Sequence, residues 1–111
     1  MKKQKKEDLA TLLNECARVC NHCAVACLSE KEVKMMAQCI RFDIDCATIC
    51  RTAAEFVERG SEHTDALLSV CAVICNSCAD ECEKHAHMEH CRICADTCRQ
   101  CAEACQQMEH V

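Results

Sequence analysis

The sequence predicts an all-α protein, an antiparallel up-down-up-down four-helix bundle built from two similar helical hairpins. The chain of 111 residues contains one Gly and no Pro, so it has few positions that break a helix. It also contains only two Phe and no Trp or Tyr, although aromatic residues are typical of strands. Its 16 Cys recur at steps of three and four residues, which is the spacing of one buried helix face. The length suits a single domain spanning 1–111.

The first predicted hairpin consists of two amphipathic helices. The first helix covers about residues 7–28, and the segment Ser29-Glu30-Lys31-Glu32 after it has the S-x-x-E pattern of a capping box. This pattern predicts that the second helix begins there and continues to about residue 59. Gly60 is the only glycine and fits the residue that follows a helix C-terminus.

The second predicted hairpin begins directly after this glycine. Ser61 is expected to cap a third helix that ends near residue 84, with Asp65 in its first turn, where the helix dipole favours acidic side chains. A short His-rich link leads to a fourth helix over about residues 88–109. Connections this short make successive helices antiparallel neighbours.

The cysteines reveal an internal repeat of 55 residues, which predicts two hairpins of one design. All of them lie on the core-facing seam, the helix face that points to the axis of a bundle. Asp43 and Met36 lie on the same seam, so the bundle is expected to be lined with sulfur. Seven cysteines of the first half, Cys16, Cys20, Cys23, Cys27, Cys39, Cys46 and Cys50, correspond to Cys71, Cys75, Cys78, Cys82, Cys94, Cys101 and Cys105, and the additional Cys91 and Cys98 correspond to Met36 and Asp43.

A seam made of thiols favours a metal-binding function over an inert core or structural disulfides. Soft thiolates select Cu(I), Zn(II) or iron–sulfur clusters. Zinc sites of four thiolates would bury negative charge that no Lys or Arg on the seam compensates. Cu(I) accepts two or three bridging thiolates, which predicts about one neutralised ion per Cys, or about sixteen ions. A zinc or cadmium thiolate store and an iron–sulfur or dithiol redox protein remain the alternatives.

Cysteine pairs one turn apart on the same helix are expected to act as chelates, because their Cβ atoms lie about 5–6 Å apart. Cys39 and Cys91 are expected to be completed from neighbouring helices or from the end of the bundle. Asp43 is the one acidic residue on the seam, and a buried carboxylate needs a metal or a thiol hydrogen bond as its partner. Exposure of Asp43 near a frayed helix is the alternative.

The two ends of the predicted bundle differ in chemistry. One end collects apolar side chains that include Leu9, Leu13, Val57 and Leu68, and it is expected to be closed. The other end, formed by residues 28–36 and 82–91, is called the mouth. Thioether and imidazole groups are weaker, exchangeable Cu(I) ligands, so we expect copper to pass there, although a solvated loop containing His is the plainer alternative. The residues expected to line the mouth are Met35, Met36, His85, His87, Met88 and His90, whereas His22, His63 and His110 are expected on the surface.

Charge and hydropathy exclude several other functions. The net charge is −5 without a basic stripe, and stacking aromatics are nearly absent, so nucleic-acid binding is not expected. No apolar run approaches the length of a membrane span, and no apolar segment follows the basic start at residues 1–6 as it would in a secretory signal. We therefore expect a cytoplasmic protein, no membrane association, and reduced thiols.

The Cys ladder on all four helices, together with Met and His at one end and an acidic residue on the seam, resembles the copper storage proteins, most closely their cytosolic branch. The resemblance covers essentially the whole chain. It implies storage of many Cu(I) ions by thiolates, no catalysis, and a homotetramer of bundles. The chain departs from this pattern in its second helix, which has three Cys and carries Met36 where a fourth could stand, so a site near Cys39 and Cys91 is expected to have mixed ligands.

Overall fold

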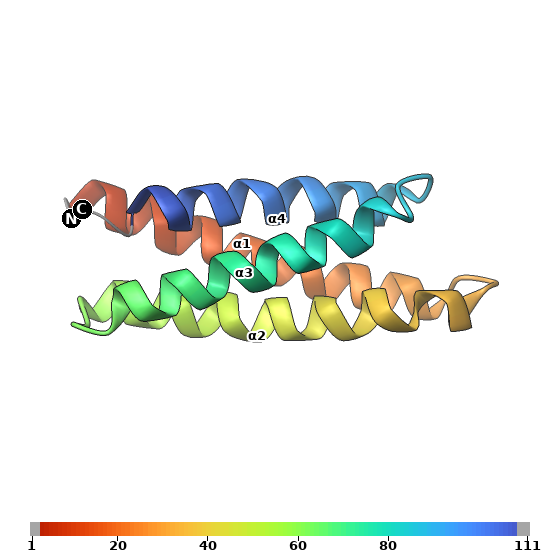
Figure 1. Ribbon diagram of the computed structural model, residues 1–111, viewed down its shortest axis with the longest axis horizontal. Helices are drawn as coiled ribbons and strands as arrows, with labels where there is room; N and C mark the ends of the chain where they lie inside the picture. Colours follow the sequence, from red (N-terminus) through yellow and green to blue (C-terminus); the bar gives the residue numbers. More distant parts are fainter. Residues whose placement is uncertain (1–2, 109–111) are drawn as a thin grey trace.

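The computed structural model describes residues 3–108, which form four long α-helices joined by short links (Figure 1). Within these residues no strand is present. The all-α fold is therefore confirmed. The helices are α1 (Lys3–Leu28), α2 (Ala37–Arg59), α3 (Thr64–Glu83) and α4 (Glu89–Met108), and a short 3-10 helix, η1 (Val33–Met36), precedes α2.

The chain reverses direction at each link, which gives the expected up-down-up-down path (Figure 1). The helix α1 packs against α2 and α4, and α3 packs against the same two helices. The resulting bundle measures 45 × 19 × 18 Å. The links after α1 and after α3 lie together at one end, the mouth, and the link between α2 and α3 lies at the other end with the start of α1 and the end of α4 (Figure 1). This topology brings the seams of all four helices to one axis.

Small side chains flank the seam and let the helices approach closely. Ala17, Ala53, Ala79, Ala95 and Ala102 are all buried, with exposures of 2% or less. Alanine loses little side-chain entropy in a helix and fills little space between two helices. The long helices therefore form without many large apolar residues, and the sulfurs of the seam are brought within reach of one another.

The start of the second helix differs from the prediction. Instead of opening α2, Ser29 and Glu30 complete the last turn of α1, because their N–H groups donate to the carbonyls of Ala26 (3.1 Å) and Cys27 (3.2 Å). Turns at 29–32 and the 3-10 helix η1 follow, and α2 begins only at Ala37, without a side-chain cap. Ser29 and Glu30 therefore belong to the end of α1, and the S-x-x-E pattern does not cap α2.

The turn between the hairpins was predicted correctly at Gly60. This residue is left-handed, with φ 64° and ψ 38°. The N–H of Gly60 donates to Val57 and that of Ser61 to Phe56, each at 3.1 Å, which is the hydrogen-bond pair of a Schellman motif. Ser61 is not the cap of α3, because the helix begins at Thr64 and His63 occupies the N-cap position. Ser61 lies in the preceding turn, where its hydroxyl accepts the N–H of His63 at 3.1 Å and its carbonyl accepts the hydroxyl of Thr64.

The outer ends of the first and last helices can also be compared with the prediction. The helix α1 begins at Lys3, four residues before the predicted start. The helix α4 follows the predicted range through Met108, while residue 109, the predicted end, lies outside the described residues. These shifts leave the positions of the seam residues unchanged.

Candidate metal centre

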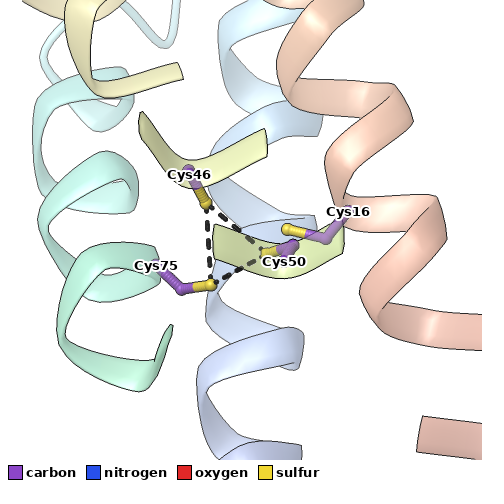
Figure 2. Close-up of side chains that lie close together, drawn as sticks. All are labelled: Cys16, Cys46, Cys50 and Cys75. Carbon is purple, nitrogen blue, oxygen red and sulfur yellow. Dashed lines mark hydrogen bonds between the residues drawn. The ribbon is translucent and has the colours of Figure 1, made fainter. Parts of the chain in front are cut away.

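All sixteen cysteines are free thiols, and each is 0% exposed. Every helix contributes to this sulfur core, as the repeat predicted. Figure 2 shows one part of it, in which the sulfurs of Cys46 and Cys50 on α2 point toward that of Cys75 on α3, with Cys16 of α1 beside them. The Sγ–Sγ distances are 3.6 Å from Cys75 to each α2 cysteine and 3.9 Å between Cys46 and Cys50.

The closest sulfur pairs join different helices. Cys39 and Cys82 are 3.5 Å apart, and Cys20 and Cys98 are 3.6 Å apart. Pairs one turn apart on the same helix, such as Cys23 and Cys27 at 4.0 Å, are slightly wider. The reason is that residues one turn apart are held at the helix pitch, whereas seam side chains of facing helices converge on the axis. The core is therefore a continuous network across helices, and pairs one turn apart on the same helix are part of it at 3.9–4.0 Å.

Several sets of four donors have all their ligand atoms within 4.8 Å of one another. These sets share members, so one thiol could bridge neighbouring ions. Those made of thiols alone include Cys16, Cys46, Cys50 and Cys75; Cys16, Cys20, Cys46 and Cys98; Cys20, Cys78, Cys94 and Cys98; and Cys50, Cys71, Cys75 and Cys101.

Asp43 is completely buried within this sulfur core, with 0% exposure. Its Oδ1 accepts hydrogen bonds from the thiols of Cys78 at 3.2 Å and Cys94 at 3.3 Å, and Cys82 lies slightly farther at 3.6 Å. Burial in the core raises the pKa of Asp43 to about 9. The exposed alternative for Asp43 is therefore wrong, and the expected thiol hydrogen bonds are present.

Within residues 3–108, the core has no buried Lys or Arg to compensate ionised thiols. The buried polar and charged side chains among residues 3–108 are Asp43, Thr64 and Glu81. Burial disfavours the charged form of a thiol, and it raises the pKa of Cys27 above the ordinary thiol value. Neutral thiols suit a closely packed, metal-free core, and a metal ion must displace their protons to bind.

The predicted mouth residues have different surroundings. The His90 ring reaches the sulfur core, with Nδ1 3.5 Å from the Sγ atoms of both Cys23 and Cys91. Met36 is also buried, at 1% exposure, whereas Met35 is 68% exposed. His85 is directed to Glu81 instead, with Nε2 3.2 Å from Oε2. Met88 packs partly buried against the core, and His87 is exposed.

The opposite end is apolar, as predicted. Leu9, Leu13, Val57 and Leu68 are buried there, with exposures of 3% or less. This closed end leaves the mouth as the place where polar and thioether side chains meet the sulfur core. His22 and His63 are exposed as expected, and His110 lies outside the described residues.

Two acidic residues near the mouth were missed by the sequence reasoning. Glu81 is only 8% exposed and contacts both Lys84 and His85. Glu30 lies beside His90, with Oε1 3.6 Å from Nε2. The i, i+4 spacing of Glu81 and His85 could have indicated the first pair. The second pair joins the turn after α1 to the start of α4, and nothing in the local sequence indicated it.

The helices of residues 3–108 lack the combination of length and apolar character needed to span a bilayer.

Among curated proteins, an uncharacterized cysteine-rich protein of Bacillus subtilis, YhjQ, is 40% identical over 81 residues, which are 73% of this chain and 74% of that protein.

Solved structures provide a closer structural comparison. A cytosolic copper storage protein from Streptomyces lividans, solved with five coppers, is 41% identical with a TM-score of 0.93, covering 97% of this chain and 94% of that one. The Cu(I)-bound copper storage protein BsCsp3, from Bacillus subtilis, is 36% identical with a TM-score of 0.88, covering 94% of this chain and 97% of that one. The family model of the copper storage proteins matches residues 2–110. On the strength of this match over nearly its whole length, the chain belongs to the copper storage protein family.

Proposed function

We propose that the protein stores many Cu(I) ions in its sulfur core. The observation that carries this proposal is the complete burial of all sixteen free thiols around one axis, with Sγ–Sγ contacts of 3.5–4.0 Å. Thiolates are preferred ligands of Cu(I), which is satisfied by two or three of them. Both copper storage proteins compared above were solved with bound copper, which supports the same use of this core.

Charge balance sets the proposed capacity. Each Cu(I) that replaces a thiol proton leaves the net charge of the core unchanged, and a thiolate that bridges two ions gives about one ion per Cys, or about sixteen ions. Zinc in four-thiolate sites would instead add uncompensated negative charge to a core without a buried cation. The shared membership of the four-sulfur sets supports bridging by individual thiols.

The proposed ligands are the sixteen cysteines, with Asp43 as a further oxygen donor inside the core and Met36 and His90 at the mouth. Met36 is favoured there because its side chain is buried, at 1% exposure. His90 is favoured because its Nδ1 lies 3.5 Å from the Sγ of Cys23. Met35, His85, His87 and Met88 are proposed as weaker participants in transfer at the mouth. Copper would enter and leave at this end because the other end is closed by apolar side chains.

We propose a non-catalytic role in the cytosol, within a single domain, and association into homotetramers. Apolar side chains on the outer faces of α2 and α3 support association, since Ile44, Val70 and Val73 are 52%, 49% and 66% exposed. Apolar surface of this kind is commonly covered by a partner. A molar mass in solution that corresponds to one chain would contradict the tetramer.

Anaerobic titration of the fully reduced protein with Cu(I), with metal counted per chain, tests the storage function. The proposal predicts saturation near sixteen ions, whereas a zinc-type store saturates at about four. Saturation with Cu(I) at four ions or fewer would overturn it. An iron–sulfur protein is distinguished in the same experiment by its brown colour as isolated.

A further inference from the structure

One four-donor set at the mouth differs from the four all-thiol sets described above because it contains an imidazole. It consists of Cys23 and Cys27 from α1 and His90 and Cys91 from α4. The three Sγ–Sγ distances are 4.0 Å for Cys23–Cys27, 3.9 Å for Cys23–Cys91 and 4.0 Å for Cys27–Cys91. His90 Nδ1 lies 3.5, 3.9 and 3.5 Å from the Sγ atoms of Cys23, Cys27 and Cys91. The four donor atoms therefore stand at the corners of a nearly regular tetrahedron.

The size of this tetrahedron fits a tetrahedral zinc ion, and the imidazole distinguishes the set from the all-thiol sets, whose Sγ–Sγ distances are similar. With metal–sulfur and metal–nitrogen bonds of about 2.3 and 2.0–2.1 Å, a tetrahedral zinc site has sulfur–sulfur edges of about 3.8 Å and sulfur–nitrogen edges of about 3.5 Å. The six observed distances are within about 0.4 Å of these values. Three thiolates and one imidazole also form a common tetrahedral zinc ligand set.

The other nitrogen of His90 supplies an independent observation. Nε2 is buried and has no hydrogen-bond partner, although the carboxylate of Glu30 lies 3.6 Å away. A metal-binding histidine usually directs its second N–H to a carboxylate, which fixes the ring and leaves the first nitrogen free to coordinate. A small movement that closes the Glu30 contact would satisfy Nε2 and present Nδ1 to the three thiols.

From this geometry we infer that Cys23, Cys27, His90 and Cys91 form a tetrahedral site for one divalent d¹⁰ ion, zinc, at the mouth of the copper store. Glu30 is its positioning residue. On binding, one Zn²⁺ forms bonds to three sulfurs and one nitrogen while the three thiols release three protons, and no electron is transferred. The site goes beyond the storage function, because it takes a single divalent ion at ligands that the copper load also uses, so zinc and Cu(I) compete for this end of the sulfur core.

Zinc is directed to this site and away from the all-sulfur sets by charge and by solvent. Zinc with three thiolates and a neutral imidazole carries one net negative charge, whereas zinc with four thiolates carries two. The side chains of His90 and Glu30 are 15% and 31% exposed, so water solvates this charge better than at the buried core sets. A surface cleft between α1 and α4, lined by His22, Ala26, Glu89 and His90, gives access to the imidazole.

The internal repeat predicts one such site and not two. The positions 55 residues from this set are Cys78, Cys82, Met35 and Met36, so thioethers replace the imidazole and the third thiolate. Met35 is also 68% exposed. Two thiolates and a thioether suit Cu(I) but form a poor zinc site. The mouth is therefore chemically asymmetric, with one half suited to zinc.

The test is an anaerobic titration of the full, reduced chain with Zn²⁺ in competition with a chromophoric chelator, with Co²⁺ as an optical probe of tetrahedral thiolate coordination. We expect one tightly bound equivalent, release of about three protons, and intense visible d–d bands with Co²⁺. The variant H90A should lose at least about tenfold in zinc affinity, and E30Q should lose about 10- to 100-fold as an outer partner. The control H63A, an exposed histidine at the closed end of the bundle, should bind zinc like the unchanged protein.

The outcomes separate this site from the storage function. Each variant is also titrated with Cu(I), and H90A should keep all but about one or two ions of its copper load. Absence of a tight zinc equivalent in the unchanged protein, or equal affinity in H90A and H63A, would overturn the inference while leaving copper storage intact. Binding of about four zinc ions that is insensitive to H90A would also overturn it, because zinc would then occupy the core.

Discussion

The buried carboxylate of Asp43 predicts a specific pH dependence for the metal-free protein. Its pKa is raised to about 9 in the folded state, chiefly by burial. In the unfolded chain the pKa of an Asp is about 3.9. At a pH between these two values, Asp43 is therefore mostly protonated in the folded state and mostly ionised in the unfolded state.

The sign and size of the effect follow from this difference. Because the pKa of Asp43 is higher in the folded state, Asp43 stabilises the folded state most below about pH 3.9. This stabilising contribution is lost as the pH rises toward about 9. Within this range the free energy of unfolding should fall by about 1.4 kcal/mol per pH unit, or about 2.7 kcal/mol from pH 5 to pH 7. Unfolded thiols remain protonated in this window, so their titration contributes little.

The substitution Asp43→Asn isolates this contribution. The amide oxygen can still accept hydrogen bonds from Cys78 and Cys94, but the side chain no longer titrates. The assay is urea unfolding of the reduced, metal-free protein at pH 5, 6 and 7, followed by circular dichroism. The slope of stability against pH should be smaller in D43N by about 1.4 kcal/mol per unit, whereas the control D45N, at an exposed position of α2, should keep the original slope. Equal slopes in D43N and the unchanged protein would refute the reasoning.

Three further predictions concern copper uptake and the stability of the bundle. Replacing both Cys39 and Cys91 with Ala should slow Cu(I) uptake and remove about two ions from the load, as measured by stopped-flow absorbance and metal analysis; an unchanged rate and load would show that the mouth is misplaced. Leu68→Ala at the closed end should lower the free energy of unfolding by about 2–5 kcal/mol, since Leu68 is 0% exposed, while the copper load stays the same; a loss under about 1 kcal/mol would contradict tight packing there. Gly60→Ala should cost about 1–2 kcal/mol in urea unfolding, because φ is 64° and the new Cβ would lie 3.2 Å from Lys6 Nζ, and an unchanged midpoint would contradict this strain.

Most of the fold and of the sulfur core could be predicted from the repeated spacing of the cysteines. Residues such as Cys16 and Cys71 share a seam position because helix periodicity is fixed by backbone geometry, and this placed all sixteen thiols in the core before any contact was known. The left-handed Gly60 was predictable for the same reason, because the required φ is accessible mainly to glycine.

Features that depend on contacts between helices could not be predicted from the sequence. The start of α2 was wrong because Ser29 and Glu30 bond back to α1, and a local capping pattern does not reveal which helix uses it. The shorter cross-helix sulfur distances and the position of Glu30 beside His90 depend on how the four helices pack. Spacing alone also could not distinguish His90, which reaches the sulfur core, from His87, which remains exposed.

The account rests on thiols of different helices sharing Cu(I) ions within one core. X-ray absorption at the copper edge, on protein loaded anaerobically with about one Cu(I) per Cys, tests this most directly. Sulfur should dominate the first coordination shell, with two to three sulfurs per copper, and a copper–copper shell should follow because bridging thiolates hold neighbouring ions together. A first shell of mainly nitrogen and oxygen, or the absence of any copper–copper scattering, would contradict it.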